Sequence, residues 1–149
     1  MHACSRADCS NAAQLLSGRM IRARTKVYFD GGCRPNPGPM ETAVVLHGVS
    51  DIRTGLAIGD SNAAEWLALI HAAEVAIAAG LEDMVFVGDS LPVINQASGL
   101  SKCRSPELRI LQARFRALVP GLPRMGLRHV PRSRNLAGIA LARRHSGLD

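Results

Sequence analysis

The most informative segment of this chain is Lys26-Val-Tyr-Phe-Asp-Gly-Gly-Cys-Arg-Pro-Asn-Pro-Gly-Pro39. Its residues Val27 to Phe29 are β-branched and aromatic, which predicts a strand. Asp30 stands where this strand is expected to end, before two glycines that allow a turn and the close approach of another backbone. The prolines that follow predict a stiff loop. On turn chemistry alone Asp30 is a turn-capping residue, but two carboxylates later in the chain favour another interpretation.

The charge of the chain is unevenly distributed. With 149 residues and a net charge of +6, it is long enough for one domain with a core of its own. No Lys or Arg occurs from Thr54 to Ser101, whereas basic residues crowd both flanks of this acidic window. Such a pattern suits a metal site that faces a polyanion, and a solvated surface with skewed charge gives the same pattern. The chain has five aromatic residues, too few for a base-stacking platform.

Hydrophobic periodicity predicts an α/β fold with a five-stranded mixed sheet and helices on both faces. Strands are expected at 27–29, 42–49, 51–58, 83–87 and 125–130, with the first three forming an antiparallel meander. Helices are expected at 61–79, at 91–97, from Ser105-Pro106 onward, and from Asn135 to about residue 144. Residues 1–24 are interpreted as an N-terminal extension of unknown role, in which Asp8 or Ser10 would cap a short helix; residues 25–149 would form the domain.

Glu65 is the informative residue of the helix expected at 61–79. At 100° per residue it shares the apolar, core-facing stripe with Leu69, whereas His71 lies on the far side. A carboxylate on that stripe is costly unless it is paired or binds a metal. The helix dipole also favours a Glu near the helix start, which explains its place along the helix but not its face.

Asp89 follows the buried strand expected at 83–87, at the end where α/β folds place ligands. It can also be read as a second capping residue, next to Ser90 at the start of a helix. Asp30, Glu65 and Asp89 would then converge on one edge of the sheet. Three carboxylates offer the hard oxygen ligands that divalent metals take.

At this point the chain resembles a type 1 ribonuclease H domain, over about residues 25 to 145. Five segments carry the resemblance in family order: YFDGG…NPGP at 28–39, SNAAEWLAL at 61–69, GDSLPVINQASG at 88–99, HVPRSRN at 129–135 and ALAR at 140–143. The resemblance implies a two-metal endonuclease, using Mg²⁺ with Mn²⁺ as a substitute, that cuts the RNA strand of an RNA–DNA hybrid. It assigns catalysis and metal binding to Asp30, Glu65 and Asp89. It assigns contacts with the hybrid to Gly31, Gly32, Cys33, Asn36, Ser61 and Asn62.

The sequence departs from the family pattern at the fourth carboxylate. In the family, that residue lies four positions after the Asn that corresponds to Asn135, the end of the segment HVPRSRN. Counting from Asn135 puts Ile139 there, and a register one residue earlier puts Gly138 there. Neither is a carboxylate, which predicts weakened metal binding. The spacing from 99 to 105 leaves no room for the basic handle helix of some members, so Lys102, Arg104 and neighbouring arginines would replace it.

Three classes of function fit these residues: a working or weakened ribonuclease H, a module that binds nucleic acid without cleaving it, and a protein-interaction domain on the same scaffold. His129 either assists product release, as the loop histidine of the family does, or is structural. The four cysteines show no paired metal-type spacing, and no signal peptide or long apolar run is present. We therefore expect a cytoplasmic monomer without membrane attachment.

Overall fold

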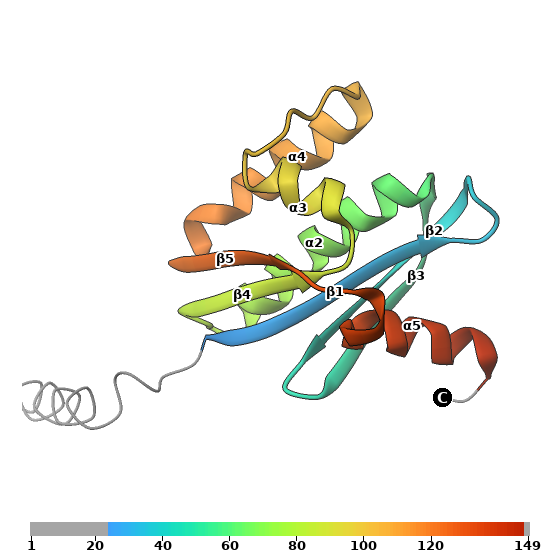
Figure 1. The fold of residues 1–149 in the computed structure, drawn as a ribbon, viewed down its shortest axis with the longest axis horizontal. Helices are drawn as coiled ribbons and strands as arrows, with labels where there is room; N and C mark the ends of the chain where they lie inside the picture. The colour runs from blue at the N-terminus through green and yellow to red at the C-terminus, as the bar shows by residue number, and fades with distance from the viewer. Residues whose placement is uncertain (1–23, 148–149) are drawn as a thin grey trace, which may run out of the picture.

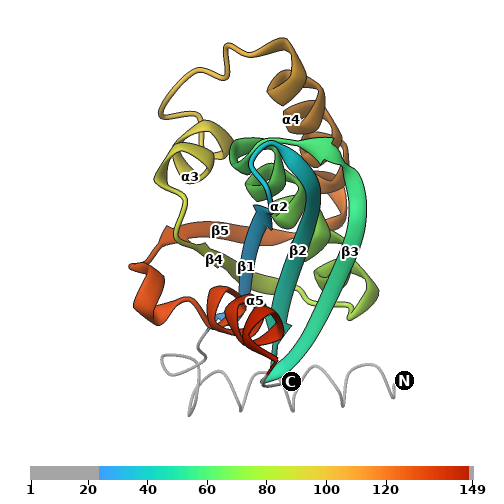
Figure 2. The ribbon, with the colours of Figure 1, turned by 90° about the vertical axis from the view of Figure 1, so that its right-hand side faces the viewer.

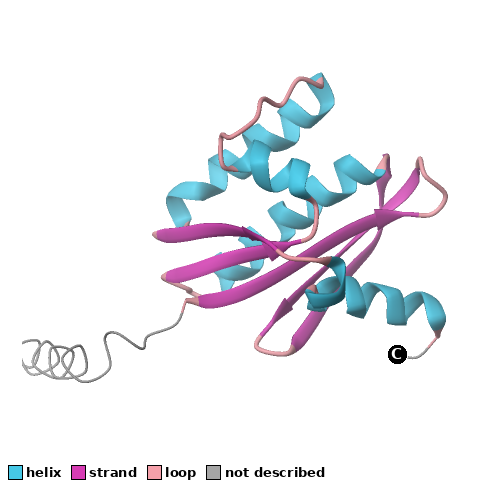
Figure 3. Cartoon of the chain, in the orientation of Figure 1, coloured by secondary structure: helices cyan, strands magenta, loops and turns pink. Residues whose placement is uncertain are grey.

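The computed structural model describes residues 24–147, so the short helix expected near the N-terminus lies outside the described range. The described residues form one five-stranded sheet with helices on both faces, as the sequence predicts (Figure 1 and Figure 3). In chain order the elements are β1 (Thr25–Cys33), β2 (Gly38–Leu46), β3 (Val49–Gly59), α2 (Ser61–Ala78), β4 (Asp83–Gly88), α3 (Leu91–Ala97), α4 (Pro106–Leu118), η2 (Val119–Gly121), β5 (Arg124–His129), η3 (Arg132–Arg134) and α5 (Leu136–Ser146).

The sheet is mixed, with strand order β3-β2-β1-β4-β5. β1, β2 and β3 form the expected antiparallel meander. β4 pairs parallel to β1, and β5 pairs parallel to β4. The ladder between β1 and β4 ends at the pair Tyr28–Val87, so the two strands separate just before Asp30 and Asp89. Ligands in α/β folds bind at such points, beyond the carboxyl ends of parallel strands.

The helices cover the two faces unequally (Figure 2). α2 packs on β1, β2 and α4 and encloses the larger core, which includes Phe29, Trp66 and Phe86, all fully buried. Of the described helices, α5 alone packs on the opposite face, over a smaller cluster that includes Val45 and Leu141. Within the described range no helix is long and apolar enough to span a lipid bilayer.

Two predicted strand ends are wrong. β1 continues to Cys33, because its backbone goes on pairing with β2 through Cys33–Met40, so Asp30 lies within a strand rather than at its end. The strand predicted at 42–49 breaks at His47 and Gly48, whose φ angles are 52° and 77°. Two consecutive residues with positive φ make the tight hairpin turn that joins β2 to β3.

The prediction for His71 is also wrong. Its side chain is 1% exposed, and Nδ1 lies 2.8 Å from Thr42 Oγ1. Helical periodicity assumes one solvated face, but α2 lies between the sheet and α4 and is buried nearly all round. Asp60, rather than Ser61, is the N-cap of this helix, and its carboxylate accepts a hydrogen bond from Ala63 N–H.

Candidate active site

Three carboxylates meet where β1 and β4 separate. Asp30 comes from β1, Glu65 from the second turn of α2, and Asp89 from the residue after β4. Each offers an oxygen, and these three oxygens lie within 4.8 Å of one another. The structure therefore brings together the three residues to which the sequence assigns catalysis.

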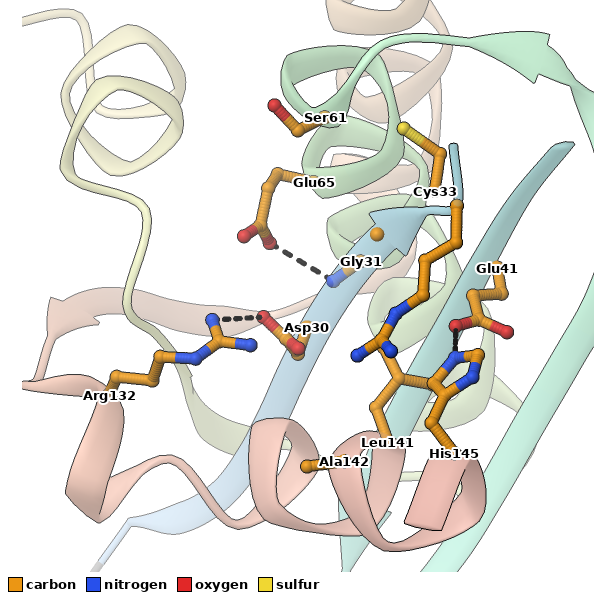
Figure 4. A pocket seen from close by; sticks show the side chains of 12 residues that line it. Asp30, Gly31, Cys33, Glu41, Ser61, Glu65, Arg132, Leu141, Ala142 and His145 are labelled. Atoms are coloured by element: carbon orange, nitrogen blue, oxygen red, sulfur yellow. Dashed lines mark hydrogen bonds and ion pairs between the residues drawn. The ribbon is translucent and has the colours of Figure 1, made fainter. Parts of the chain in front are cut away.

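Asp30 is the most buried member of the triad, with 1% of its surface exposed. Because side chains alternate along a strand, Phe29 enters the core under α2 while Asp30 faces α5. Neither carboxylate oxygen of Asp30 has a hydrogen-bond partner within the described residues. The nearest cation is Arg132, whose Nη1 lies 3.8 Å from Asp30 Oδ1 (Figure 4). The same atom lies 3.6 Å from Asp89 Oδ1.

Glu65 reaches the site because α2 crosses β1 at very short range. A Cβ atom on Gly31 would lie 2.0 Å from the backbone oxygen of Ala64, so only glycine fits at this crossing. The contact lets Gly31 N–H donate a hydrogen bond of 3.1 Å to Glu65 Oε1. The glycine that follows Asp30 thus serves helix packing rather than a turn.

Asp89 is oriented by Asn135, the N-cap of α5. Asn135 is fully buried, and its Nδ2 donates to Asp89 Oδ2 at 2.8 Å and to the carbonyl oxygen of Phe29 at 2.9 Å. Its Oδ1 accepts from Ala137 N–H, which caps the helix. One amide side chain therefore joins β1, the end of β4 and the start of α5.

The low polarity of the site favours protonated carboxyl groups. Burial raises the pKa of Glu65 to about 9, and the carboxylates of Asp30 and Asp89 add to the effect. Burial likewise raises the pKa of Asp30 to about 6, with Asp89 adding to the shift and Arg132 opposing it. Without a cation, the ionised triad is unfavourable.

We expect the metal-free protein to lose stability as pH rises. Folding raises both pKa values above their ordinary 3.8 and 4.5, so between about pH 4 and 9 the folded state holds more protons than the unfolded state. The free energy of unfolding must then fall as pH rises through this window. The two pKa shifts together correspond to a loss on the order of several kcal/mol. Urea unfolding in EDTA from pH 4 to 9 measures the slope. Glu65→Gln should flatten its upper part, from about pH 6 to 9; a slope that Glu65→Gln leaves unchanged would contradict this assignment.

The residues of the triad fit a divalent metal. Asp30 is buried, and neither of its oxygens has a hydrogen-bond partner in the described part of the chain, an arrangement that is costly unless a cation shares them. All three ligand atoms are carboxylate oxygens, which magnesium and manganese prefer. Arg132 is 69% exposed, so its guanidinium can swing away without disturbing the core.

The expected substrate contacts lie around the triad with one exception. A cavity of about 260 Å³ is lined by Asp30, Glu65, Gly31, Gly32, Cys33 and Ser61. At its rim Asn36 Nδ2 donates to Ser61 Oγ and Asn36 Oδ1 accepts from Cys33 Sγ, both at 3.4 Å. Asn62 does not line this cavity; it lies in a separate hollow with Met40 and Leu108.

The two candidates for the fourth carboxylate position have different surroundings. Gly138 is buried beneath the triad, where a Cβ atom would lie 3.5 Å from Asp30 Oδ2 and 3.6 Å from Asp89 Oδ2. Ile139, the next residue, is 42% exposed. A substitution at Ile139 therefore leaves the core intact.

Sequence reasoning missed four residues of the site. Arg132 lies within the segment 129–135, and Asn135 is recognisable only as a residue before a helix, because a buried N-cap amide has no signature in one sequence. Glu41 and His145 also line the cavity and contact each other through Oε2 and Nε2. They are 104 residues apart, so only the fold could pair them. His129 is exposed on β5 and does not line the cavity.

Comparisons with known proteins identify relatives of this chain. A family described as reverse transcriptase-like matches residues 29–145. Ribonuclease HI of Halobacterium salinarum is 39% identical over an alignment of 124 residues, which covers 80% of this chain and 62% of that protein. The crystal structure of RNase H1 from this archaeon aligns with a TM-score of 0.75 at 33% identity, over 84% of this chain and 99% of that chain.

Two further solved structures are similar. The N-terminal RNase H domain of Rv2228c from Mycobacterium tuberculosis gives a TM-score of 0.69 at 28% identity, over 80% of this chain and 95% of that chain. LC11-RNase H1 in complex with an RNA/DNA hybrid gives 0.66 at 27% identity, over 75% and 88%. The chain belongs to the type 1 ribonuclease H family. It spans 62% of the curated halobacterial relative and 34% of the mycobacterial one.

Proposed function

We propose that this protein is a metal-dependent endonuclease that hydrolyses the RNA strand of RNA–DNA hybrids. The observation that carries the proposal is the buried Asp30, which lies with Glu65 and Asp89 at one site and whose two oxygens have no hydrogen-bond partner among residues 24–147. Two Mg²⁺ ions held by these carboxylates would supply an activated water and stabilise the leaving oxygen of an in-line displacement.

The residues of the chain have separate tasks in this proposal. Asp30, Glu65 and Asp89 would hold the ions with their carboxylate oxygens. Asn135 keeps Asp89 in place, and the Gly31 N–H keeps Glu65 in place. Arg132, displaced from the carboxylates by metal, would turn to a substrate phosphate, for which a guanidinium is well suited. Asn36 and Ser61 would contact the backbone and sugars at the rim, where the 2′-hydroxyl distinguishes RNA from DNA.

A binding module without cleavage is the second candidate, because no carboxylate stands at position 138 or 139. One panel of duplexes separates the two functions. We expect a hybrid with different labels on its strands to be cut in the RNA strand alone, giving 3′-hydroxyl and 5′-phosphate ends, with DNA duplex left intact. Binding of the hybrid without cleavage in Mg²⁺ or Mn²⁺ would support the module, and an inert protein would contradict both. The same panel with double-stranded RNA shows whether that duplex is also a substrate.

The missing fourth carboxylate gives a prediction about the choice of metal. Water can fill the vacant coordination position but brings no charge, so the metals should bind more weakly. Mg²⁺ should suffer most because it requires near-octahedral geometry, while Mn²⁺ binds oxygen sites more tightly. We expect low activity in Mg²⁺, higher activity in Mn²⁺, and a gain in metal affinity of about tenfold or more in Ile139→Asp.

Gly138→Asp is the matched control for the other register. Position 138 is buried against two carboxylates, so a third one there should lower the melting temperature in EDTA by repulsion and desolvation. Ile139→Asp, at an exposed position, should leave that temperature unchanged. Metal titrations followed by melting and by cleavage measure both effects. If both variants fold and neither changes the metal response, the vacant-ligand hypothesis fails.

A further inference from the structure

The cavity that is lined by Asp30 and Glu65 has a second, basic end. Side chains alternate along β1, so Asp30 and Gly32 follow one another on the α5 side of the sheet. Arg34 follows the end of β1 and lines the same cavity. Glu41 of β2 pairs directly with Gly32 and therefore shares this side. Two strand residues rise by about 7 Å. Arg34, Glu41 and His145, which we call the basic end, thus begin one short step from the triad and line the same cavity.

The charge of Glu41 is already compensated. Its side chain is 11% exposed, with Oε2 against His145 Nε2 and Oε1 3.7 Å from Arg144 Nε. A buried carboxylate without such partners would be costly. In Figure 4 the Glu41–His145 pair lies across Gly31 and Leu141 from Arg132. Glu41 contributes one negative charge, and the guanidinium groups of Arg144 and Arg34 contribute two positive ones, so this end has a positive surplus.

We propose that the basic end binds a phosphate of the RNA strand next to the one that is cut. The proposal rests on the proposed nuclease function and adds a residue set that the triad does not need. An RNA strand with one phosphate at the triad can continue along the cavity toward the basic end or leave the cavity. Because its phosphates are negatively charged, the direction with the surplus of positive charge is favoured. Glu41 acts as the positioning residue, because its Oε2 contacts Nε2 of His145 and fixes the imidazole ring. The other ring nitrogen, Nδ1, would then donate to the phosphate. Donation by both ring nitrogens requires the protonated ring.

The test compares His145→Gln with Arg143→Gln. Gln can still donate a hydrogen bond to Glu41, so the packing of α5 is retained while the second donor is lost. Arg143 belongs to the same helix but does not line the cavity, so its substitution removes a charge of the general surface. We expect His145→Gln to raise KM for the hybrid about tenfold with little change in kcat. The salt dependence of hybrid binding, measured by anisotropy in the Asp30→Asn background, should lose about one unit of slope.

Methylphosphonate hybrids locate the contact. When one RNA phosphate at a time is replaced by a neutral group, hybrid binding by the wild-type protein should weaken at one position beside the cut. The same replacement should leave hybrid binding by His145→Gln unchanged. Hybrid binding by Arg34→Gln should likewise be insensitive to the neutral group at that position. If His145→Gln weakens binding no more than Arg143→Gln, or lowers only the melting temperature, the inference is wrong while the nuclease function stands. If the wild-type protein neither cleaves nor binds the hybrid, both fall.

Discussion

We expect Asp30→Asn to remove cleavage and at the same time to stabilise the metal-free protein. The amide side chain introduced by Asp30→Asn keeps the shape but loses the negative charge that would help to hold a divalent metal. We expect a loss in kcat on the order of a thousandfold or more, equivalent to about 4 kcal/mol of transition-state stabilisation. The opposite effect on stability follows from burial. At pH 8 the wild-type side chain is an ionised group that is 1% exposed, lies beside two other carboxyl groups and has no hydrogen-bond partner in the described range.

The measurements are single-turnover cleavage of a labelled hybrid in Mn²⁺ and a thermal melt in EDTA at pH 8. Asp60→Asn is the matched control, because Asp60 is exposed, lies outside the triad and caps α2, a task that Asn performs equally well. It should leave both quantities unchanged. Full activity of Asp30→Asn in a preparation free of contaminating nuclease would show that the cavity is not the active site.

Replacing Gly31 by Ala should be among the most damaging single-methyl changes in the domain. The new Cβ would lie 2.0 Å from the carbonyl oxygen of Ala64 and 2.9 Å from Glu65 N. These are backbone atoms of a helix held by the main core, so they cannot rotate away as a side chain would. Overpacking costs typically about 1–3 kcal/mol, and we expect a loss in the free energy of unfolding of about 3 kcal/mol or more here.

Gly32→Ala provides the comparison within the same strand. Its Cβ would have Leu141 Cδ2 at 4.0 Å as its nearest neighbour, an ordinary contact. Urea unfolding should therefore show Gly32→Ala close to the wild type and Gly31→Ala strongly destabilised. To make room for the new Cβ at position 31, α2 would have to move, and Glu65 would move with it. Gly31→Ala should therefore require more Mn²⁺ for cleavage even below its melting temperature. Equal effects of the two substitutions would show that α2 does not cross β1 at this short distance.

Much of the fold is predictable because each element carries its own local signal. Ser105-Pro106 marks the start of α4, and alternation and turn residues give the approximate positions of the strands. The errors arise where pairing between elements overrides local preference. β1 passes Asp30 because β2 continues to pair with it, and His71 is buried because its side chain faces β2 and β3, where its two ring nitrogens contact Thr42 and Asp51.

The candidate site is predictable to a different extent. The sequence alone shows that Glu65 places a carboxylate on the apolar, core-facing side of a helix. Such a carboxylate is costly unless it is paired or binds a metal, so the sequence already indicates a metal site. The side chains that hold the triad are not visible in this way. Asn135 reaches Asp89 over 46 residues and Glu41 meets His145 over 104, so their roles exist only once the sheet and α5 have assembled. Similarly, motif counting leaves positions 138 and 139 equivalent, whereas the structure buries one and exposes the other.

The most direct measurement is a Mn²⁺ titration of the wild-type protein followed in two ways, by the melting temperature and by the rate of cleavage of the RNA strand of a hybrid. If the triad holds the catalytic ions, the same range of metal concentration should raise both quantities, and Asp30→Asn should abolish both responses. Cleavage that persists in EDTA, or a metal-induced rise in melting temperature that Asp30→Asn leaves intact, would contradict the assignment of Asp30, Glu65 and Asp89 as the metal site of a nuclease.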